Sequence, residues 1–109
     1  MKRTWISEHG EGYAVPACIT SALHDESWHN DACPHFCRKD DPMLVGGSLE
    51  DMPVLSLWVE HPAMEMRDSL GGARFLVIRN HEHPDVPEAL LETDDAEEAV
   101  ALILKQPIP

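Results

Sequence analysis

The sequence contains few basic residues. Only 8 Lys and Arg residues stand against 20 Asp and Glu residues in a chain of 109, so the formal net charge is -12 with neutral histidines. Affinity for nucleic acids comes mainly from clustered Lys and Arg, and anionic membrane surfaces attract the same side chains. We therefore expect neither direct nucleic-acid binding nor membrane binding. The partner that this charge favours is a basic protein surface.

Long apolar segments are also absent. No stretch approaches the roughly 20 apolar residues that a membrane-spanning helix needs. No apolar segment follows the basic residues near the N-terminus, so we expect no signal peptide. The three cysteines, Cys18, Cys33 and Cys37, are an odd number and cannot all pair within one chain. These features favour a cytoplasmic protein with free or metal-bound thiols, the alternative being a Cys33–Cys37 disulfide with Cys18 buried as a small hydrophobic residue.

The length suits one domain with a single modest core, and we predict one domain over residues 1–109. Residues 1–48 form a Cys/His-rich segment with all three cysteines, four of the seven histidines and little periodicity. Residues 53–105 carry the regular patterns of a sheet and a helix. We predict an α+β fold in which a small antiparallel sheet of about three strands is packed by one C-terminal helix. The loop-rich N-terminal segment is expected against the edge or the other face of the sheet.

Three segments have the composition of strands. Residues 54–59 alternate, with Leu55, Leu57 and Val59 on one face, and prolines flank this segment. Residues 73–79 are rich in β-branched and aromatic side chains and predict a second strand. A short third strand is predicted over residues 89–92. Residues 12–19 suggest a further short strand, interrupted or placed at an edge by Pro16.

The C-terminal pattern predicts a helix over residues 95–105. Thr93 or Asp94 is the expected N-cap, and Asp94 followed by Glu97 fits a capping box. Apolar residues recur at helical spacing and form a stripe that can cover the apolar face of the sheet. Acids near the N-terminal end and Lys105 near the C-terminal end both suit the helix dipole.

The segment from His24 to Cys37 concentrates potential metal ligands. Five zinc-capable side chains lie within it, namely His24, His29, Cys33, His35 and Cys37. Zinc sites in proteins use four such donors in a tetrahedron. The second CxxC pair of the familiar structural sites is missing, so our predicted site is His29, Cys33 and Cys37 with either Cys18 or His24. Structural Zn²⁺ would help to order a segment that has few aliphatic residues.

A metal-free interpretation stays open beside the zinc site. In that case Cys33 and Cys37 are small buried residues and the histidines are solvated. His81 and His83 form a second candidate pair, more simply explained as an exposed turn. A further alternative is a small metal- or thiol-dependent enzyme. In its thiol-dependent form, Cys33 would be the nucleophile and His29 or His35 would activate it. Against this, the surrounding acids would raise the pKa of the thiol.

The segment Cys33-Pro34-His35-Phe36-Cys37 has the form Cys-Pro-x-aromatic-Cys. With two following strands, the second ending in Arg79, and an acid-capped C-terminal helix, it resembles a group of small, uncharacterised domains of actinobacteria and their phages. The resemblance covers about residues 33–105. Such domains often carry a further histidine soon after the second cysteine, where this chain has residues 38–41 without one. The resemblance therefore implies neither an activity nor a complete metal site.

The acidic tract supplies the leading functional hypothesis. Residues 82–98 contain eight acids and no Lys or Arg. Such a surface accelerates encounter with basic partners, and it also keeps a small protein soluble. We expect a non-enzymatic binding module for a basic protein surface, and the resemblance makes a phage-encoded modulator of a host protein one concrete form. A DNA mimic, with acids in phosphate-like rows, and the small enzyme above are the alternatives.

Overall fold

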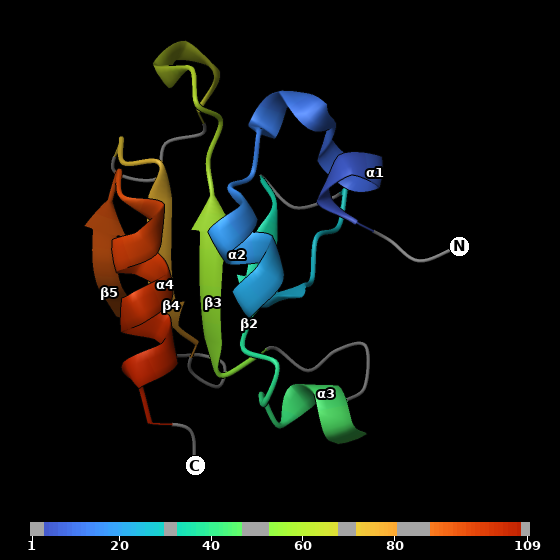
Figure 1. Ribbon diagram of the computed structural model, residues 1–109, viewed down its shortest axis with the longest axis vertical. Coiled ribbons are helices and arrows are strands. Elements are labelled where there is room, and N and C mark those ends of the chain that lie inside the picture. The colour runs from blue at the N-terminus through green and yellow to red at the C-terminus, as the bar shows by residue number, and fades with distance from the viewer. Residues whose placement is uncertain (1–3, 30–32, 47–52, 68–71, 81–87, 108–109) are drawn as a thin grey trace.

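The computed structural model describes residues 4–29, 33–46, 53–67, 72–80 and 88–107. They form a five-stranded antiparallel sheet whose strands follow one another in chain order (Figure 1). The strands are β1 (His24–Asp25), β2 (His35–Cys37), β3 (Leu55–Val59), β4 (Phe75–Arg79) and β5 (Glu88–Thr93). The helices are α1 (Trp5–His9), α2 (Ala17–Ala22), α3 (Met43–Gly46) and α4 (Ala96–Lys105), with 3₁₀ turns η1 (Glu11–Tyr13) and η2 (Met64–Met66).

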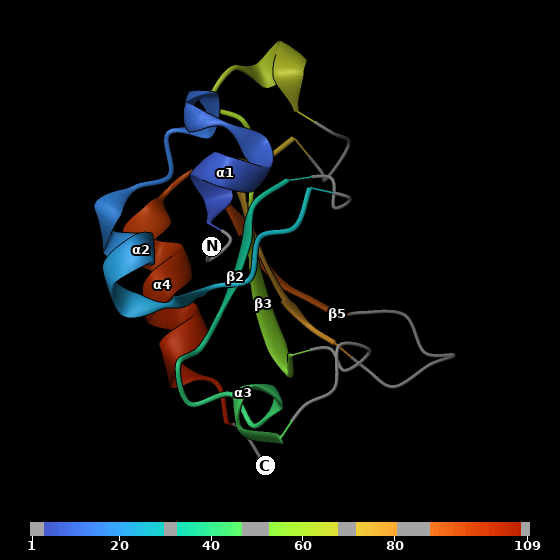
Figure 2. The ribbon, with the colours of Figure 1, turned by 90° about the vertical axis from the view of Figure 1, so that its right-hand side faces the viewer.

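Two layers make up the molecule, since α2 and α4 lie side by side on one face of the sheet (Figures 1 and 2). The α+β class and the C-terminal helix are confirmed. The prediction of about three strands is wrong, because β1 and β2 extend the sheet on the far side of β3. These two strands have two and three residues. Alternation over so few positions leaves no recognisable sequence pattern.

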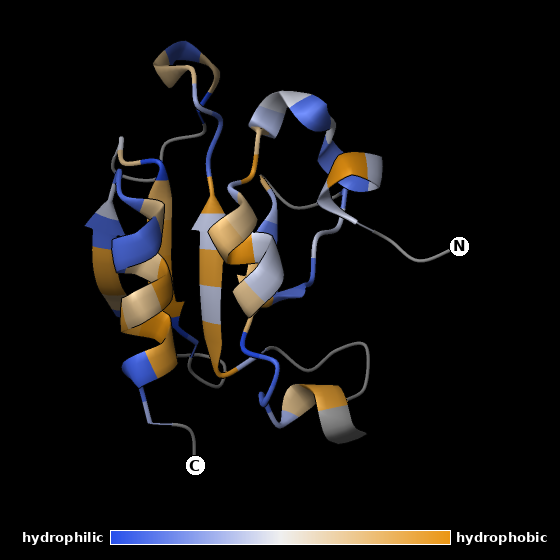
Figure 3. Ribbon diagram, viewed as in Figure 1, coloured by the Kyte–Doolittle hydropathy of each residue, from blue (hydrophilic) through white to orange (hydrophobic). Residues whose placement is uncertain are grey.

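Strands β3 and β4 carry the predicted alternation. Leu55, Leu57 and Val59 of β3 are completely buried on the helix-covered face, beside Phe75 and Val77 of β4. In Figure 3, β3 accordingly alternates between strongly and weakly hydrophobic residues. The third predicted strand is also present as β5, which is one residue longer at each end.

The two parts of the chain share one core. Val15, Ile19, Leu23 and Phe36 from the N-terminal part belong to the same buried cluster as the core residues of β3, β4 and α4. The predicted loop-rich character of residues 1–48 is therefore wrong over the described residues, which include three helices and two strands. Local patterns missed these elements because each is short and is stabilised mainly by packing on the sheet.

The strand suggested over residues 12–19 is a wrong prediction. Residues 11–13 form η1 and residues 17–22 form α2, with Pro16 as the N-cap of α2. Proline suits a helix start because its missing N–H would have no partner in the first turn. Only Ile19 of α2 is fully buried, so this helix shows no apolar stripe in the sequence.

Helix α4 begins at Ala96, as predicted within one residue, but its cap differs. Asp95 rather than Thr93 or Asp94 is the N-cap, and its Oδ1 accepts hydrogen bonds from the backbone N–H groups of Glu97 (3.0 Å) and Glu98 (3.3 Å). Asp94 instead accepts the backbone N–H of Arg74 at 2.9 Å. The predicted apolar stripe does face the sheet, with Ala99 and Ile103 fully buried.

Candidate functional site

Two of the predicted metal ligands, His24 and Cys37, are direct partners across β1 and β2. Paired residues of an antiparallel ladder lie on the same face of the sheet. Glu26 lies beside them, with its Oε1 at 3.1 Å from His24 Nε2 and at 4.0 Å from Cys37 Sγ. No sequence signal marked Glu26. Its position follows only once β1 is known, because residues two apart in extended chain share a face.

The Cys37 thiol is completely buried. Burial raises the pKa of this thiol well above the ordinary 9.0, and the carboxylates of Glu26 and Asp41 raise it further. The protonated thiol donates toward Glu26, while the thiolate needed by a nucleophile is disfavoured. The cluster of His24, Glu26 and Cys37 is therefore arranged as a partly buried structural contact.

Cys33 lies at a bend two residues before β2, and Cys37 is the last residue of that strand. Residues 35–37 form β2, and the backbone oxygen of Pro34 continues the ladder by accepting Val59 N–H at 2.9 Å. The structure has Cys18, Cys33 and Cys37 as free thiols, without a Cys33–Cys37 disulfide.

The other predicted ligands lie elsewhere. Cys18 is on α2 and packs against the core, on the face of the sheet opposite Cys37. His29 is half-exposed, and its Nδ1 lies 3.3 Å from Glu8 Oε1. Among the predicted ligands, His24 and Cys37 lie together as partners across β1 and β2. No group of three or more His, Cys, Asp or Glu side chains in the described part of the chain is arranged to hold a metal ion. His81 and His83 lie outside the described residues.

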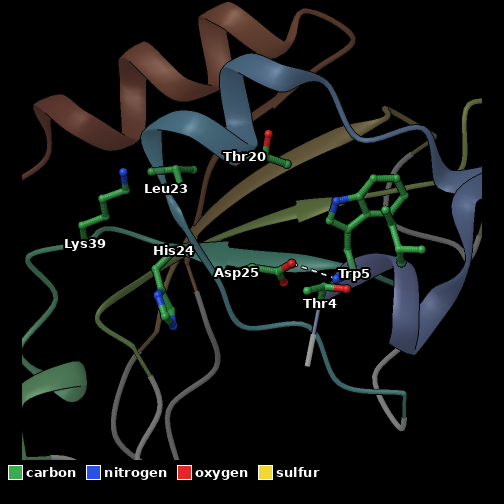
Figure 4. A pocket seen from close by; sticks show the side chains of 8 residues that line it. Thr4, Trp5, Thr20, Leu23, His24, Asp25 and Lys39 are labelled. Atoms are coloured by element: carbon green, nitrogen blue, oxygen red, sulfur yellow. Dashed lines mark hydrogen bonds between the residues drawn. The ribbon is translucent and has the colours of Figure 1, made fainter. Parts of the chain in front are cut away.

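An open cleft of about 470 Å³ lies between α1, α2 and β1. Figure 4 shows Trp5 at one side, Lys39 and Leu23 at the other, and Asp25 between them. Its polar groups already have partners within the fold. Asp25 accepts the backbone N–H groups of Trp5 (2.7 Å) and Ser27 (2.9 Å), and Lys39 Nζ donates to the backbone oxygen of Ser21 at 2.8 Å. The cleft contains no paired acid and base set for catalysis.

Among the described residues, exposed acids gather where β5 ends and α4 begins. We call this surface the acidic end, and its exposed residues are Glu92, Asp94, Asp95, Glu97 and Glu98. Asp95 caps α4, and Asp94 lies 3.6 Å from Arg67 Nη1. Within the described residues, the carboxylates of Glu92, Glu97 and Glu98 form no ion pair. Three negative charges at one end of the molecule are thus available to a partner.

In the described remainder of the acidic tract, Glu88 and Glu92 do not lie in one row. Glu82 and Asp85 lie outside the described residues. In the ladder between β4 and β5, Glu88 lies opposite Arg79 and Glu92 lies opposite Leu76. An irregularity between Val77 and Ile78 interrupts the register. Arg79 and Leu76 lie on opposite faces of β4, so Glu88 and Glu92 also lie on opposite faces. The phosphate-like row expected of a DNA mimic is therefore absent from β5.

No protein-family model, curated protein or solved structure matches the chain. Among the described residues, no helix is both long enough and apolar enough to cross a bilayer.

Proposed function

We propose that the protein is a non-enzymatic binding module that engages a basic protein surface through its acidic end. The observation that carries the proposal is the exposure of Glu92, Glu97 and Glu98 without an ion pair among the described residues. Carboxylates that already have partners would lose those partners on binding, whereas none of these three forms an ion pair with another described residue. The net charge of -12 adds a long-range field that attracts cations.

The other two sites described above support a binding role better than a catalytic one. Cys37 is held as a thiol by burial, and the polar groups of the open cleft bond to the protein itself. A phage-encoded modulator of a host protein remains one concrete form of the proposal, and it depends on the resemblance of residues 33–105. Cytoplasmic location belongs to the same proposal.

A defined basic peptide tests the proposal. We expect an unstructured Lys-rich peptide to bind, with a dissociation constant that rises about tenfold or more between 50 and 300 mM NaCl, because salt screens exposed charges. The double variant Glu92→Lys/Glu97→Lys should lose most of this binding. Glu11→Lys/Glu65→Lys changes the net charge equally at two other exposed acids and is the matched control. Equal loss in both variants, or binding that is indifferent to salt, would contradict the acidic end as the site.

A further inference from the structure

The two edges of the sheet differ in how they are protected. Strand β1 has only two residues, and α1 is joined to it by the Trp5 N–H bond to Asp25. Strand β5 has six residues and lies at the opposite edge, with β4 on one side (Figure 1). Among the described residues, no element pairs with the outer side of β5. Such an edge presents backbone N–H and C=O groups that can pair with another strand.

The direction of the backbone groups of β5 follows from the ladder. Glu60 N–H donates to the backbone oxygen of Arg74 at 2.7 Å, so even-numbered residues of β4 turn their backbone groups toward β3. Odd-numbered residues of β4 therefore face β5, where they pair with Leu91 and Thr93. Glu92 lies between these two and turns its N–H and C=O outward. An exposed acid of the strand thus coincides with an outward-facing peptide group.

A second copy of this chain is a poor occupant of this edge. Pairing of β5 with a second copy would bring Glu88 and Glu92 of both copies to the same edge, and like charges repel one another. A partner strand with Lys or Arg side chains at this edge would instead be attracted by the carboxylates of β5. A strand with Lys or Arg side chains on the face of Glu92 would meet a carboxylate there.

We propose that β5 binds an extended, basic segment of a partner protein as a sixth strand of the sheet. The inference rests on the proposed function and adds the conformation of the partner. Main-chain hydrogen bonds to the outward-facing groups at Glu92 supply affinity, as in other strand-addition complexes. Glu92, Glu97 and Glu98, all near the end of β5, select Lys and Arg in the added strand.

Two peptides of equal charge separate strand addition from charge attraction alone. The first is a hexapeptide in which Lys alternates with Val. The second has the same sequence with alternate backbone nitrogens methylated, which removes N–H donors and keeps every charge. We expect the methylated peptide to bind at least about tenfold more weakly at 50 mM NaCl, because each lost main-chain bond weakens binding by a factor of several.

Amide exchange measured by NMR gives a second readout. In the complex with the unmethylated peptide, exchange of the Glu92 amide should slow at least about tenfold, while the Leu91 amide, already turned toward β4, should change little. Glu92→Gln should weaken the binding of both peptides, and Glu11→Gln should weaken the binding of neither. Equal binding of the two peptides without protection at Glu92 would overturn strand addition and leave the proposed function standing. Binding of neither peptide would overturn both proposals.

Discussion

The guanidinium of Arg74 joins the start of β4 to the N-terminal part of the chain, donating to the backbone oxygen of Tyr13, 61 residues away, at 2.7 Å. It also donates to the backbone oxygen of Ala14 at 2.9 Å, where the chain passes through a left-handed conformation (φ 46°). Burial, followed by the nearby Arg67, lowers the pKa of Arg74. The N-terminal segment is thus anchored to the sheet by a side chain of the sheet itself.

Replacing Arg74 should loosen this anchor. We expect Arg74→Ala to lower the free energy of unfolding by about 1 to 2 kcal/mol, because charge-assisted bonds to two carbonyls are lost and water replaces them only in part. Urea denaturation at pH 7 measures the change. Arg79→Ala is the matched control, since the bonds of Arg79 to Pro107 and Gln106 are longer, at 3.4 Å. An equal loss in both variants would argue against a special role for Arg74.

A second anchor is the buried carboxylate of Asp41. Its Oδ1 accepts the backbone N–H of Met43 at 3.1 Å, and its Oδ2 accepts that of Val54 at 2.9 Å. We expect Asp41→Ala to lower the free energy of unfolding, measured by denaturant titration, by about 2 to 4 kcal/mol, because two N–H groups lose their acceptor. Asp41→Asn should lose less, since the amide keeps one oxygen but turns an N–H₂ group toward one of these donors.

The adjacent Asp40 supplies the control for Asp41. Its side chain is 63% exposed and pairs with Arg38 at 2.7 Å. Exposed ion pairs contribute little to stability, so the free energy of unfolding of Asp40→Ala should be almost that of the native protein. If Asp40→Ala and Asp41→Ala were equally unstable, the cost would reflect local charge and not the buried bonds.

The buried thiol of Cys37 predicts an alkaline loss of stability. Its pKa is raised in the folded state, so the unfolded thiol releases its proton first as the pH rises through its ordinary value of 9.0. The stabilisation is therefore fully present below about pH 9 and is lost above it, at about 1.4 kcal/mol per pH unit for one thiol. Between pH 8 and 10.5, the free energy of unfolding should fall more steeply with rising pH for the native protein than for Cys37→Ser. Parallel curves would mean that Cys37 is not held as a thiol.

The zinc site predicted from the sequence can be decided by metal removal. Because no group of three or more potential ligands is arranged to hold a metal among the described residues, we expect treatment with a chelator to leave the unfolding temperature and the native mass unchanged. Native mass spectrometry with and without the chelator measures bound metal directly. A loss of one zinc ion with a fall in the unfolding temperature would show that the thiols rearrange around an ion, and it would restore the predicted site.

The successful predictions concern elements whose signal is local. Alternation over residues 54–59 and 73–79 located β3 and β4, and the helical stripe with nearby acids located α4. The exact N-cap was missed because Thr93, Asp94 and Asp95 are all good caps, and the choice depends on Asp94 bonding to Arg74 N–H across the turn.

For the candidate site, the sequence alone identified the clustered donors but not their geometry. It did identify the acidic tract, and the structure shows which members are exposed and which are committed to Arg67 or to the α4 cap. Glu26, the contact shared by His24 and Cys37, carried no signal at all. Which side chains meet depends on strand register, and a strand of two residues has no periodicity from which to read it.

The amino-acid sequence by itself determined the α+β class, the faces of β3 and β4, the C-terminal helix and the strong negative charge, because each depends on neighbours a few positions away. Only the tertiary structure decided that the first part of the chain adds two strands and the helix α2 to the fold, that the three cysteines are free thiols, and that β5 lies at an edge of the sheet with no described element paired to its outer side. These features arise from contacts between residues distant along the chain, such as Arg74 with Tyr13, which no local pattern encodes.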